Sequence, residues 1–405
     1  MRLAAFRKRL SIIKLGGAIM LKSLKIKNFI SFKNEAVIDF TKTNYTILPQ
    51  NVNQESGILK GTMFVGGNGA GKSAIITALK LFLDLMFEEE EIEFQKYRCF
   101  ENNNPEFILE YTFSLNGSEI CYRLKYNAIN NMISEKLILN GKKILNREGA
   151  TAISCFEDEE NVYDEKLVKK NGIFLRTLYF NGLLQYSDVL KEWIEFLKNS
   201  VYINASIGAG GRIGSKKLDV YFNENGTDEI NQFLEKYGYD QRISYTSKVD
   251  NQYQQIMAEE NVLFYNRVGN NFSVPFIFES LGNRNLIRIL TDYLKVIREG
   301  GMLIIDEFSS GLHNELECLL VKHFMRESKN SQLCFVSHST NLMSNSILRP
   351  DQIYTVDYIL GKGSQVNRVS SFQPRNSQNI EKMYNSGAFQ GKPFYEEVID
   401  EDKQR

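Results

Sequence analysis

A glycine-rich stretch from Phe64 to Ser73 constrains the fold of this chain more than any other feature. It fits the pattern G-x-x-x-x-G-K-[ST], in which glycines let consecutive backbone N–H groups point inward around phosphate oxygens. The apolar segment 62–65 precedes it, and residues 74–79 follow without a helix breaker. Strand, loop and helix in this order bring the positive end of the helix dipole to a bound anion. The sequence therefore predicts a nucleoside triphosphate site in an α/β fold.

Two side chains of this loop have separate predicted roles. The Lys72 ammonium is expected near the β- and γ-phosphates, and the Ser73 hydroxyl is expected to bind Mg²⁺. The other residues expected to contact ATP are those of the loop itself and the start of the helix: Gly66, Gly67, Asn68, Gly69, Ala70, Gly71 and Ala74. A guanine nucleotide is not favoured, because the chain has no N-K-x-D motif.

The composition is ordinary for a globular protein of 405 residues, with 43% apolar and 24% charged side chains. Basic and acidic residues balance at 49 each, so no overall basic excess favours nucleic-acid binding. The five cysteines are widely spaced and form no C-x-x-C pair. This pattern favours neither a disulfide framework nor a zinc site, and it suits a reducing cytoplasm.

The first 19 residues are expected to lie outside the fold. The basic run 7–9 and the apolar stretch after it resemble a signal peptide, but Lys14 interrupts the stretch and no cleavage site follows. A strand pattern starts directly after Met20, so residues 1–19 are interpreted as a non-native or disordered extension. No other segment has 18 consecutive apolar residues, and a cytoplasmic protein without a membrane partner is expected.

Residues 20–154 are expected to combine the phosphate-binding loop with an antiparallel β subdomain. Two Asn-Gly dipeptides, at 116–117 and 140–141, predict hairpin turns. The helix after the loop is expected to bury one face, and the acidic run 88–91 is interpreted as solvated rather than metal-binding. The predicted strands are 24–27, 36–40, 45–48, 107–113, 120–124 and 136–139.

Residues 155–270 are expected to form an inserted, mainly helical lobe. Amphipathic patterns predict helices at 187–197 and 227–237. The glycine-rich stretch 208–214 between them lacks a preceding strand and a Lys-Ser pair, so it is interpreted as a mobile loop rather than a second phosphate site.

A second group of candidate residues lies at the end of an apolar strand, 302–305. Asp306 at its tip is expected to hold Mg²⁺ through water, and the following Glu307 is the candidate general base. A large insertion separates this group from Lys72.

This division resembles the ABC-type ATPases of the SMC, RecF and double-strand-break-repair kind, in which an inserted arm splits the nucleotide-binding head. The resemblance implies a mixed sheet with flanking helices, a C-terminal half of the head at 271–370 and a tail at 371–405. It implies that Lys72, Glu307 and His338 are catalytic, with His338 as the switch histidine that senses the γ-phosphate. It also implies a D-loop at Ser309, Ser310 and Gly311.

The segment Phe278–Arg284 resembles the signature element of the same ATPases and opens an amphipathic helix. Ser280 and Gly282 keep its S-x-G core, and Ser280 is expected to cap the helix. The resemblance implies that these two residues contact ATP bound to a second subunit, in a head-to-tail dimer or higher homo-oligomer.

From Met20 to about Pro393 the chain also resembles the prokaryotic "AAA family ATPase" group found in phage-defence systems such as PARIS, Septu, AbiL and RloA. The residues that carry this resemblance are Glu279–Leu286, Asp306–Glu307 with Leu312–His313, Leu348–Tyr354 and Asn379–Tyr384. It implies an ATP-binding sensor or scaffold subunit of an abortive-infection type defence system. Through ATP-dependent assembly, this subunit would control a separately encoded nuclease or toxin.

Two alternatives stay open. A RecF-like repair or recombination ATPase would clamp DNA, with phosphate contacts from Lys22, Lys25, Lys27 and Lys33 or from Arg212, Lys216 and Lys217. An ATP-sensing scaffold would bind nucleotide with negligible turnover.

Some positions depart from the ABC pattern. Gln95 is the nearest candidate for the Q-loop glutamine, and Ile30 stands where many relatives carry a basic residue, which Lys27 or Lys33 would replace. His313 and His323 are expected on the surface or in the subunit contact.

Overall fold

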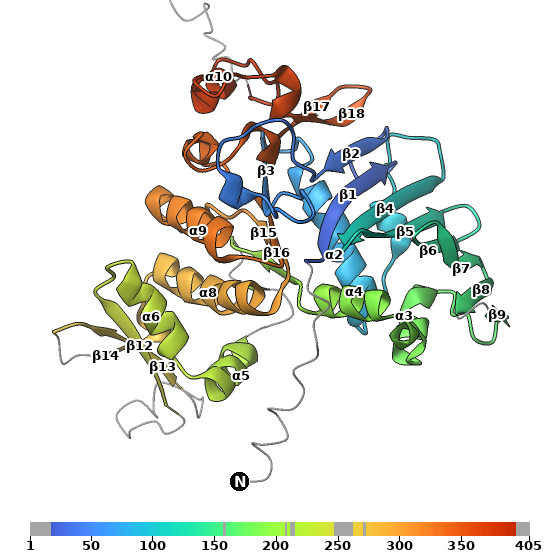
Figure 1. Ribbon diagram of the computed structural model, residues 1–405, viewed down its shortest axis with the longest axis horizontal. Helices are drawn as coiled ribbons and strands as arrows, with labels where there is room; N and C mark the ends of the chain where they lie inside the picture. The colour runs from blue at the N-terminus through green and yellow to red at the C-terminus, as the bar shows by residue number, and fades with distance from the viewer. Residues whose placement is uncertain are drawn as a thin grey trace, which may run out of the picture.

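Figure 1 shows the computed structural model of the protein, which describes residues 18–156, 159–206, 209–210, 215–246, 262–269 and 273–393. At its centre lies a seven-stranded sheet with the order β11-β10-β15-β16-β3-β17-β18. The five middle strands run parallel, and the two edge strands pair antiparallel. The strands are β3 (Gly61–Gly66), β10 (Val201–Asn204), β11 (Ala209–Gly210), β15 (Gly301–Asp306), β16 (Ser331–Val336), β17 (Ile353–Ile359) and β18 (Gly363–Arg368). The predicted α/β fold is confirmed.

A second sheet of eight strands is antiparallel throughout, in the order β2-β1-β4-β5-β6-β7-β8-β9. Both predicted Asn-Gly turns form, with φ of 48° and 80° at Asn116 and Gly117 and of 50° and 81° at Asn140 and Gly141. Positive φ at both central residues gives a turn whose twist matches that of the strands. The strands are β1 (Met20–Lys27), β2 (Ala36–Asp39), β4 (Glu106–Leu115), β5 (Ser118–Asn127), β6 (Met132–Leu139), β7 (Lys142–Glu148), β8 (Thr151–Phe156) and β9 (Glu159–Tyr163).

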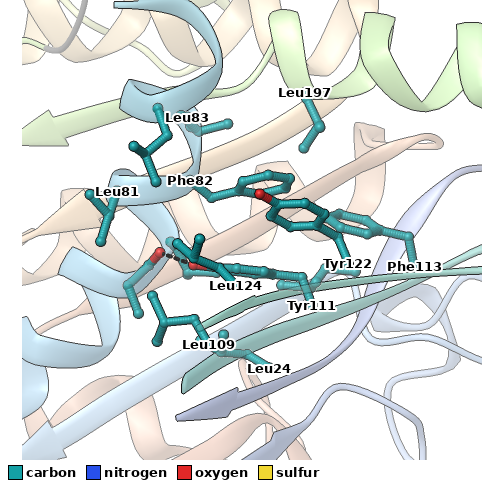
Figure 2. Close-up of a cluster of buried hydrophobic side chains, with 14 of the residues drawn as sticks. Leu24, Leu81, Phe82, Leu83, Leu109, Tyr111, Phe113, Tyr122, Leu124 and Leu197 are labelled. Atoms are coloured by element: carbon teal, nitrogen blue, oxygen red, sulfur yellow. Dashed lines mark hydrogen bonds between the residues drawn. The ribbon is translucent and has the colours of Figure 1, made fainter. Parts of the chain in front are cut away.

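Helix α2 (Lys72–Phe87) lies between the two sheets (Figure 1). Figure 2 shows Phe82 of this helix beside the Tyr111 and Tyr122 rings, with centroid separations of 4.6 and 4.9 Å. The Tyr111 hydroxyl donates to the Ala78 carbonyl at 2.6 Å. A helix covered by a sheet on each side is apolar nearly all round. The buried side chains therefore extend beyond the single predicted face and include Ile75, Ile76, Leu81 and Leu85.

Helices α8 (Leu281–Glu299) and α9 (Asn314–Glu327) cover the opposite face of the parallel sheet (Figure 1). The apolar face of α8 packs on β10, β15 and β16, which buries Leu286, Ile289, Leu290, Tyr293 and Leu294 and partly buries Ile297. Helix α4 (Asp188–Lys198) lies on the α2 side and is capped by the Ser187 hydroxyl, which accepts from the Leu190 N–H. Helices α4 and α6 (Asp228–Lys236) confirm the two amphipathic helices predicted in this part of the sequence.

The prediction of one inserted helical lobe at 155–270 is wrong in its boundaries. Strand β9 extends the antiparallel sheet, and β10 enters the parallel sheet beside β15, with Tyr202 opposite Ile304. The apolar run Val201–Ile203 is too short for periodicity to identify it as a strand. The remaining elements beside α8 are α5 (Ser215–Asn225), α6, β12 (Gln241–Thr246), β13 (Val262–Arg267) and β14 (Ser273–Pro275). Residues 1–17 of the predicted extension lie outside the described residues, but Ala18 and Ile19 are buried in the core, so the predicted extension is two residues too long. Residues 208 and 211–214 of the predicted mobile loop also lie outside them, whereas 209–210 form β11 beside β10.

The strand predicted at 45–48 does not form. The Ile47 carbonyl accepts from Arg349 at 3.0 Å, and the Tyr45 hydroxyl donates to the Pro374 carbonyl at 2.8 Å. Leu48 takes a left-handed φ of 49° before Pro49, where a 3₁₀ helix begins. The segment thus pairs with distant loops instead of a neighbouring strand.

Short helices complete the architecture. They are α3 (Phe174–Phe180), α10 (Ile380–Asn385) and the 3₁₀ helices Pro49–Asn51, Phe94–Tyr97, Leu183–Tyr186, Phe276–Phe278, Thr340–Met343, Pro350–Gln352 and Val369–Phe372. Within the ranges given above, no helix has the length and apolarity needed to cross a membrane.

Candidate nucleotide-binding site

The predicted phosphate-binding loop joins the end of β3 to the start of α2, as its pattern requires. At two positions of the loop, neighbouring atoms leave no room for a side chain, so glycine is required. A Cβ at Gly66 would overlap the Val356 carbonyl oxygen of β17. At Gly71, where φ is 110°, a Cβ would lie 2.7 Å from the Ser31 hydroxyl and would overlap Ser364. Only glycine fits at both ends of the loop.

Lys72 folds back over this loop. Its ammonium donates to the Gly66 carbonyl at 3.0 Å and to the Gly67 carbonyl at 2.7 Å. The side chain is buried, and this burial lowers the pKa of Lys72, while the negative charges of Asp306 and Glu307 act in the opposite direction. The ammonium therefore lies within the loop, in reach of the acids at the end of β15.

The Ser73 hydroxyl at the start of α2 lies beside the Asp306 carboxylate at the end of β15, with Oγ and Oδ1 3.4 Å apart. Burial raises the pKa of Asp306, and the Ser73 hydrogen bond opposes this shift. Among the described residues, no three His, Cys, Asp or Glu side chains gather into a metal cage. Mg²⁺ at nucleotide sites needs no such cage, because one or two carboxylates, phosphates and water supply its oxygens. A hydroxyl beside a buried carboxylate fits this kind of binding.

Glu307 lies directly after Asp306 in a left-handed conformation, with φ 52°. Its N–H donates to Asp306 Oδ1 at 3.1 Å, and its carbonyl accepts from the Ser310 N–H at 2.8 Å. Positive φ is uncommon for a residue other than glycine and persists where the surroundings enforce it. This turn places an exposed carboxylate next to a buried one.

His338 follows β16, the strand between β15 and β3. Its backbone N–H donates to the Ser309 hydroxyl at 3.3 Å. Partial desolvation lowers the pKa of His338, and the Lys72 charge lowers it further, against the charges of Glu307 and Asp306. Parallel strands end at one edge of a sheet, where α/β proteins bind ligands. The structure therefore brings Lys72, Ser73, Asp306, Glu307 and His338 to this edge.

Ser280 and Gly282 lie in a different place, at the start of α8. The Ser280 hydroxyl accepts from the Asn283 N–H at 3.2 Å, which confirms the predicted cap. A Cβ at Gly282 would lie 2.6 Å from the Gly311 carbonyl, so the helix start touches the segment Ser309–Gly311. Asn285 links the same two regions, since its side-chain amide donates to the Ala205 and Ser310 carbonyls. These residues form a second group, separate from the loop that holds Lys72.

The structure does not test the roles considered for three positions that depart from the ABC pattern. Gln95 is exposed in the 3₁₀ helix Phe94–Tyr97. The Ile30 N–H donates to the Tyr97 carbonyl at 2.7 Å. The Lys33 ammonium donates to the Gly361 carbonyl at 3.0 Å.

The expected surface position of His323 is wrong. The side chain is buried between α8 and α9, with Nδ1 2.8 Å from the Tyr293 hydroxyl. Burial lowers the pKa of His323 to about 4. His323 faces inward because it shares the α9 face of Leu320 and Phe324, which are also buried. His313 is exposed at the N-cap of the same helix, as expected.

Several residues around the loop carry no sequence signal. The Ser364 hydroxyl donates to the Ala70 carbonyl at 2.6 Å. Pro393 lies close to Gly67, since a Cβ added to this glycine would be 3.3 Å from the proline Cβ. Tyr202 lies near Asp306, whose charge adds to the effect of burial in raising the pKa of the phenol. These contacts join segments that are far apart along the chain, so no local motif could have identified them.

Comparison with solved structures found SMC heads at low identity. The SMC head domain from Thermotoga maritima has 16% identity and a TM-score of 0.46, with 86% of this chain and 98% of that chain covered. An SmcHead bound to the C-winged helix domain of ScpA has 13% identity and a TM-score of 0.47, with 90% and 99% covered. An Smc head with an extended coiled coil, bound to the C-terminal domain of ScpA derived from Pyrococcus furiosus, has 12% identity and a TM-score of 0.46, with 91% and 98% covered. No curated protein matches the chain.

A family model gives the firmer result. It matches residues 62–344, more than half of the chain and a range that includes both groups of predicted site residues. Its description is "AAA domain, putative AbiEii toxin, Type IV TA system". The chain belongs to this family of AAA-domain proteins.

Proposed function

We propose that the protein is a Mg²⁺-dependent ATPase that works as a homo-oligomer. One observation carries this proposal: the ends of β3, β15 and β16 bring together an ammonium, a hydroxyl beside a buried carboxylate, an exposed carboxylate and an imidazole. Phosphoryl transfer needs mainly positioning and charge stabilisation, which such a set of groups provides.

Each group has a role in this proposal. Lys72 exchanges the carbonyls of Gly66 and Gly67 for phosphate oxygens, which compensate its charge better than neutral carbonyls do. Ser73 and Asp306 hold Mg²⁺, which supplies charge neutralisation on the phosphates. The Glu307 carboxylate orients the attacking water and accepts its proton. His338 donates a hydrogen bond to the γ-phosphate.

The second group of residues, Ser280 and Gly282, acts on ATP held by another subunit. Ser280 is exposed, and so are two large apolar neighbours, Phe278 at 60% and Leu281 at 51%. Exposed apolar side chains beside a helix N-terminus suit a surface that becomes covered in an assembly. A head-to-tail pair would thus complete two ATP sites at once.

In the cell, we propose, the ATPase is the sensor or scaffold subunit of an abortive-infection type anti-phage system and controls a separate nuclease or toxin. The family description names a putative AbiEii toxin and a type IV toxin–antitoxin system, which supports a link to a toxin–antitoxin system. The DNA-clamp alternative gains less support. Lys22 pairs with Glu119, and Lys25 pairs with Glu35 and Glu110, so acids neutralise part of the basic patch near the N-terminus. The side chains of Arg212, Lys216 and Lys217 lie outside the described residues.

The proposed ATPase activity is tested by measuring the light-scattering mass of wild type and Glu307→Gln with and without Mg-ATP. Phosphate release is recorded on the same samples. We expect the variant to gain mass with ATP and to lose phosphate release. A constant mass together with absent turnover in the wild type would instead support the non-hydrolysing scaffold.

Phage challenge tests the cellular role. Phage should form fewer plaques on cells that express the chain with its neighbouring genes than on cells that carry Lys72→Ala in the same genes. Equal plaque counts would contradict the defence assignment and leave the ATPase measurement untouched.

A further inference from the structure

We propose that Glu317 is a positioning residue for His338, holding the loop around this histidine through both of its carboxylate oxygens. The proposal rests on the ATPase function proposed above, because it assigns a task to a residue that does not touch the phosphates. Glu317 lies on α9 and contacts the loop that follows β16.

The contacts of Glu317 fall on the two residues that flank His338. Its Oε1 accepts a hydrogen bond from the Ser337 hydroxyl at 3.2 Å, and its Oε2 accepts a short one from the Ser339 hydroxyl. Glu317, Ser337 and Ser339 are all buried, whereas His338 between the serines is exposed. Side chains alternate along an extended chain. Fixing the two serines toward α9 therefore turns the imidazole to the opposite side, toward solvent and the site.

The loop is held further by a small hydrogen-bond network. The Ser339 N–H donates to the Ser337 hydroxyl at 3.0 Å, so both serines act as one unit. The Ser339 hydroxyl also lies 3.3 Å from Asn314 Oδ1 at the start of α9. Together with the His338 N–H bond to Ser309, these contacts hold the loop from α9 and from the segment after β15.

A carboxylate is an unusual choice for this position. Glu317 is fully buried, and burying an ionised group costs free energy that an apolar residue would not incur. Burial raises the pKa of Glu317, while the hydrogen bonds from Ser339 and Ser337 oppose the shift. Replacing Glu317 alone would leave the buried Ser337 and Ser339 hydroxyls without this acceptor. The carboxylate therefore satisfies both hydroxyls and, in doing so, fixes the geometry of the histidine loop.

The location of α9 gives this arrangement a further consequence. The helix begins at Asn314, shortly after the segment Ser309–Gly311, which touches the start of α8. A second subunit that contacts this segment would shift the first turn of α9 and, through Glu317, the loop of His338. Contact with a second subunit would thereby affect γ-phosphate sensing by His338 through the Glu317 side chain.

Two variants test the proposal. Glu317→Leu removes both acceptors at similar volume, and Glu317→Gln keeps one carbonyl oxygen for a serine hydroxyl. We expect ATP binding to stay within about 2-fold of wild type and kcat to fall by about 10-fold or more in Glu317→Leu, the cost of misplacing a group in the site. The loss should be smaller in Glu317→Gln. The matched control is Glu327→Gln, an ion-paired acid at the far end of the same helix, which should keep the wild-type kcat.

The His338→Ala background distinguishes positioning from general damage to the fold. If Glu317 acts through the histidine, Glu317→Leu should reduce kcat no further once His338 is absent. An equal loss in both backgrounds, or a wild-type kcat in Glu317→Leu, would overturn the proposal. Absence of turnover in the wild type itself would count against the ATPase function instead.

A spectroscopic measurement keeps the test independent of turnover. The chain has three histidines, so labelled imidazole resonances can be assigned with one variant for each. Glu317→Leu should shift or broaden the His338 resonance and leave that of the buried His323 in place. An unchanged His338 resonance would refute the proposal, whether or not the protein hydrolyses ATP.

Discussion

The two groups of site residues differ in whether their side chains bond within the chain or are exposed. In the group around the phosphate-binding loop, Lys72 bonds to Gly66 and Gly67, and Ser73 meets Asp306. At the start of α8, Ser280 is exposed beside exposed apolar side chains. The side chains of the first group bond to one another and to the loop, whereas the second group presents an exposed surface. This difference suits the shared site proposed above, in which one subunit would hold the nucleotide and the other would cover it.

The largest effect on ATP binding should come from Lys72→Ala. The variant loses the charge-assisted bonds to phosphate, so ATP binding should weaken by on the order of 100-fold, and ATP should no longer change the mass. Titration calorimetry with ATP measures this directly. Lys80→Ala, which removes an ion-paired lysine from the same helix, serves as the control. Unchanged affinity in Lys72→Ala would rule out the phosphate-binding assignment of the first group.

Glu307→Gln should separate binding from chemistry. Loss of the general base is expected to lower kcat by about 10²- to 10⁴-fold while the affinity for ATP is kept. Phosphate release and ATP titration on one preparation measure both quantities. Glu299→Gln, at the end of α8, is the control for removing an acid. A variant that still hydrolyses at the wild-type rate would assign the proton transfer to another group.

Ser280→Arg tests the second group by obstructing the partner surface. Each variant chain should still bind ATP but should hydrolyse little, since the substitution acts on ATP held by the other subunit. Mixing this variant with Lys72→Ala should recover part of the rate, because one of the two sites in a mixed pair then has both halves intact. If mixing recovers nothing while mixed pairs form, the site is not divided between chains as proposed.

The smallest effect concerns stability at low pH. His323 has a pKa of about 4 in the fold and about 6.5 when unfolded, so the unfolded chain binds more protons between these values. The free energy of unfolding should therefore rise from pH 4 to 6.5 and then level off for this group. Because His323 lies between α8 and α9, its protonation should loosen the second group more than the first. Urea unfolding of wild type and His323→Asn across this range should show a flatter profile in the variant.

Local patterns predicted the parts of the fold that local chemistry determines. The phosphate-binding loop, both Asn-Gly turns and the cap at Ser280 depend on residues within a few positions of one another. The pattern did not predict that β10 enters the parallel sheet, that 45–48 pairs with distant loops, or that His323 is buried. Each depends on a partner far along the chain. The network of Glu317 is of this second kind, since its carboxylate and the serines lie on different elements.

Helix α2 has its N-terminus at the phosphate-binding loop and its body packed between two sheets (Figure 2). Exposing its amide groups to solvent requires the sheets to separate, so its amide hydrogens should exchange with deuterium among the slowest in the protein. A helix that resists local opening does not bend in response to a ligand at its end. If a ligand at the phosphate-binding loop moves α2, the helix and the antiparallel sheet stacked on it should therefore move together.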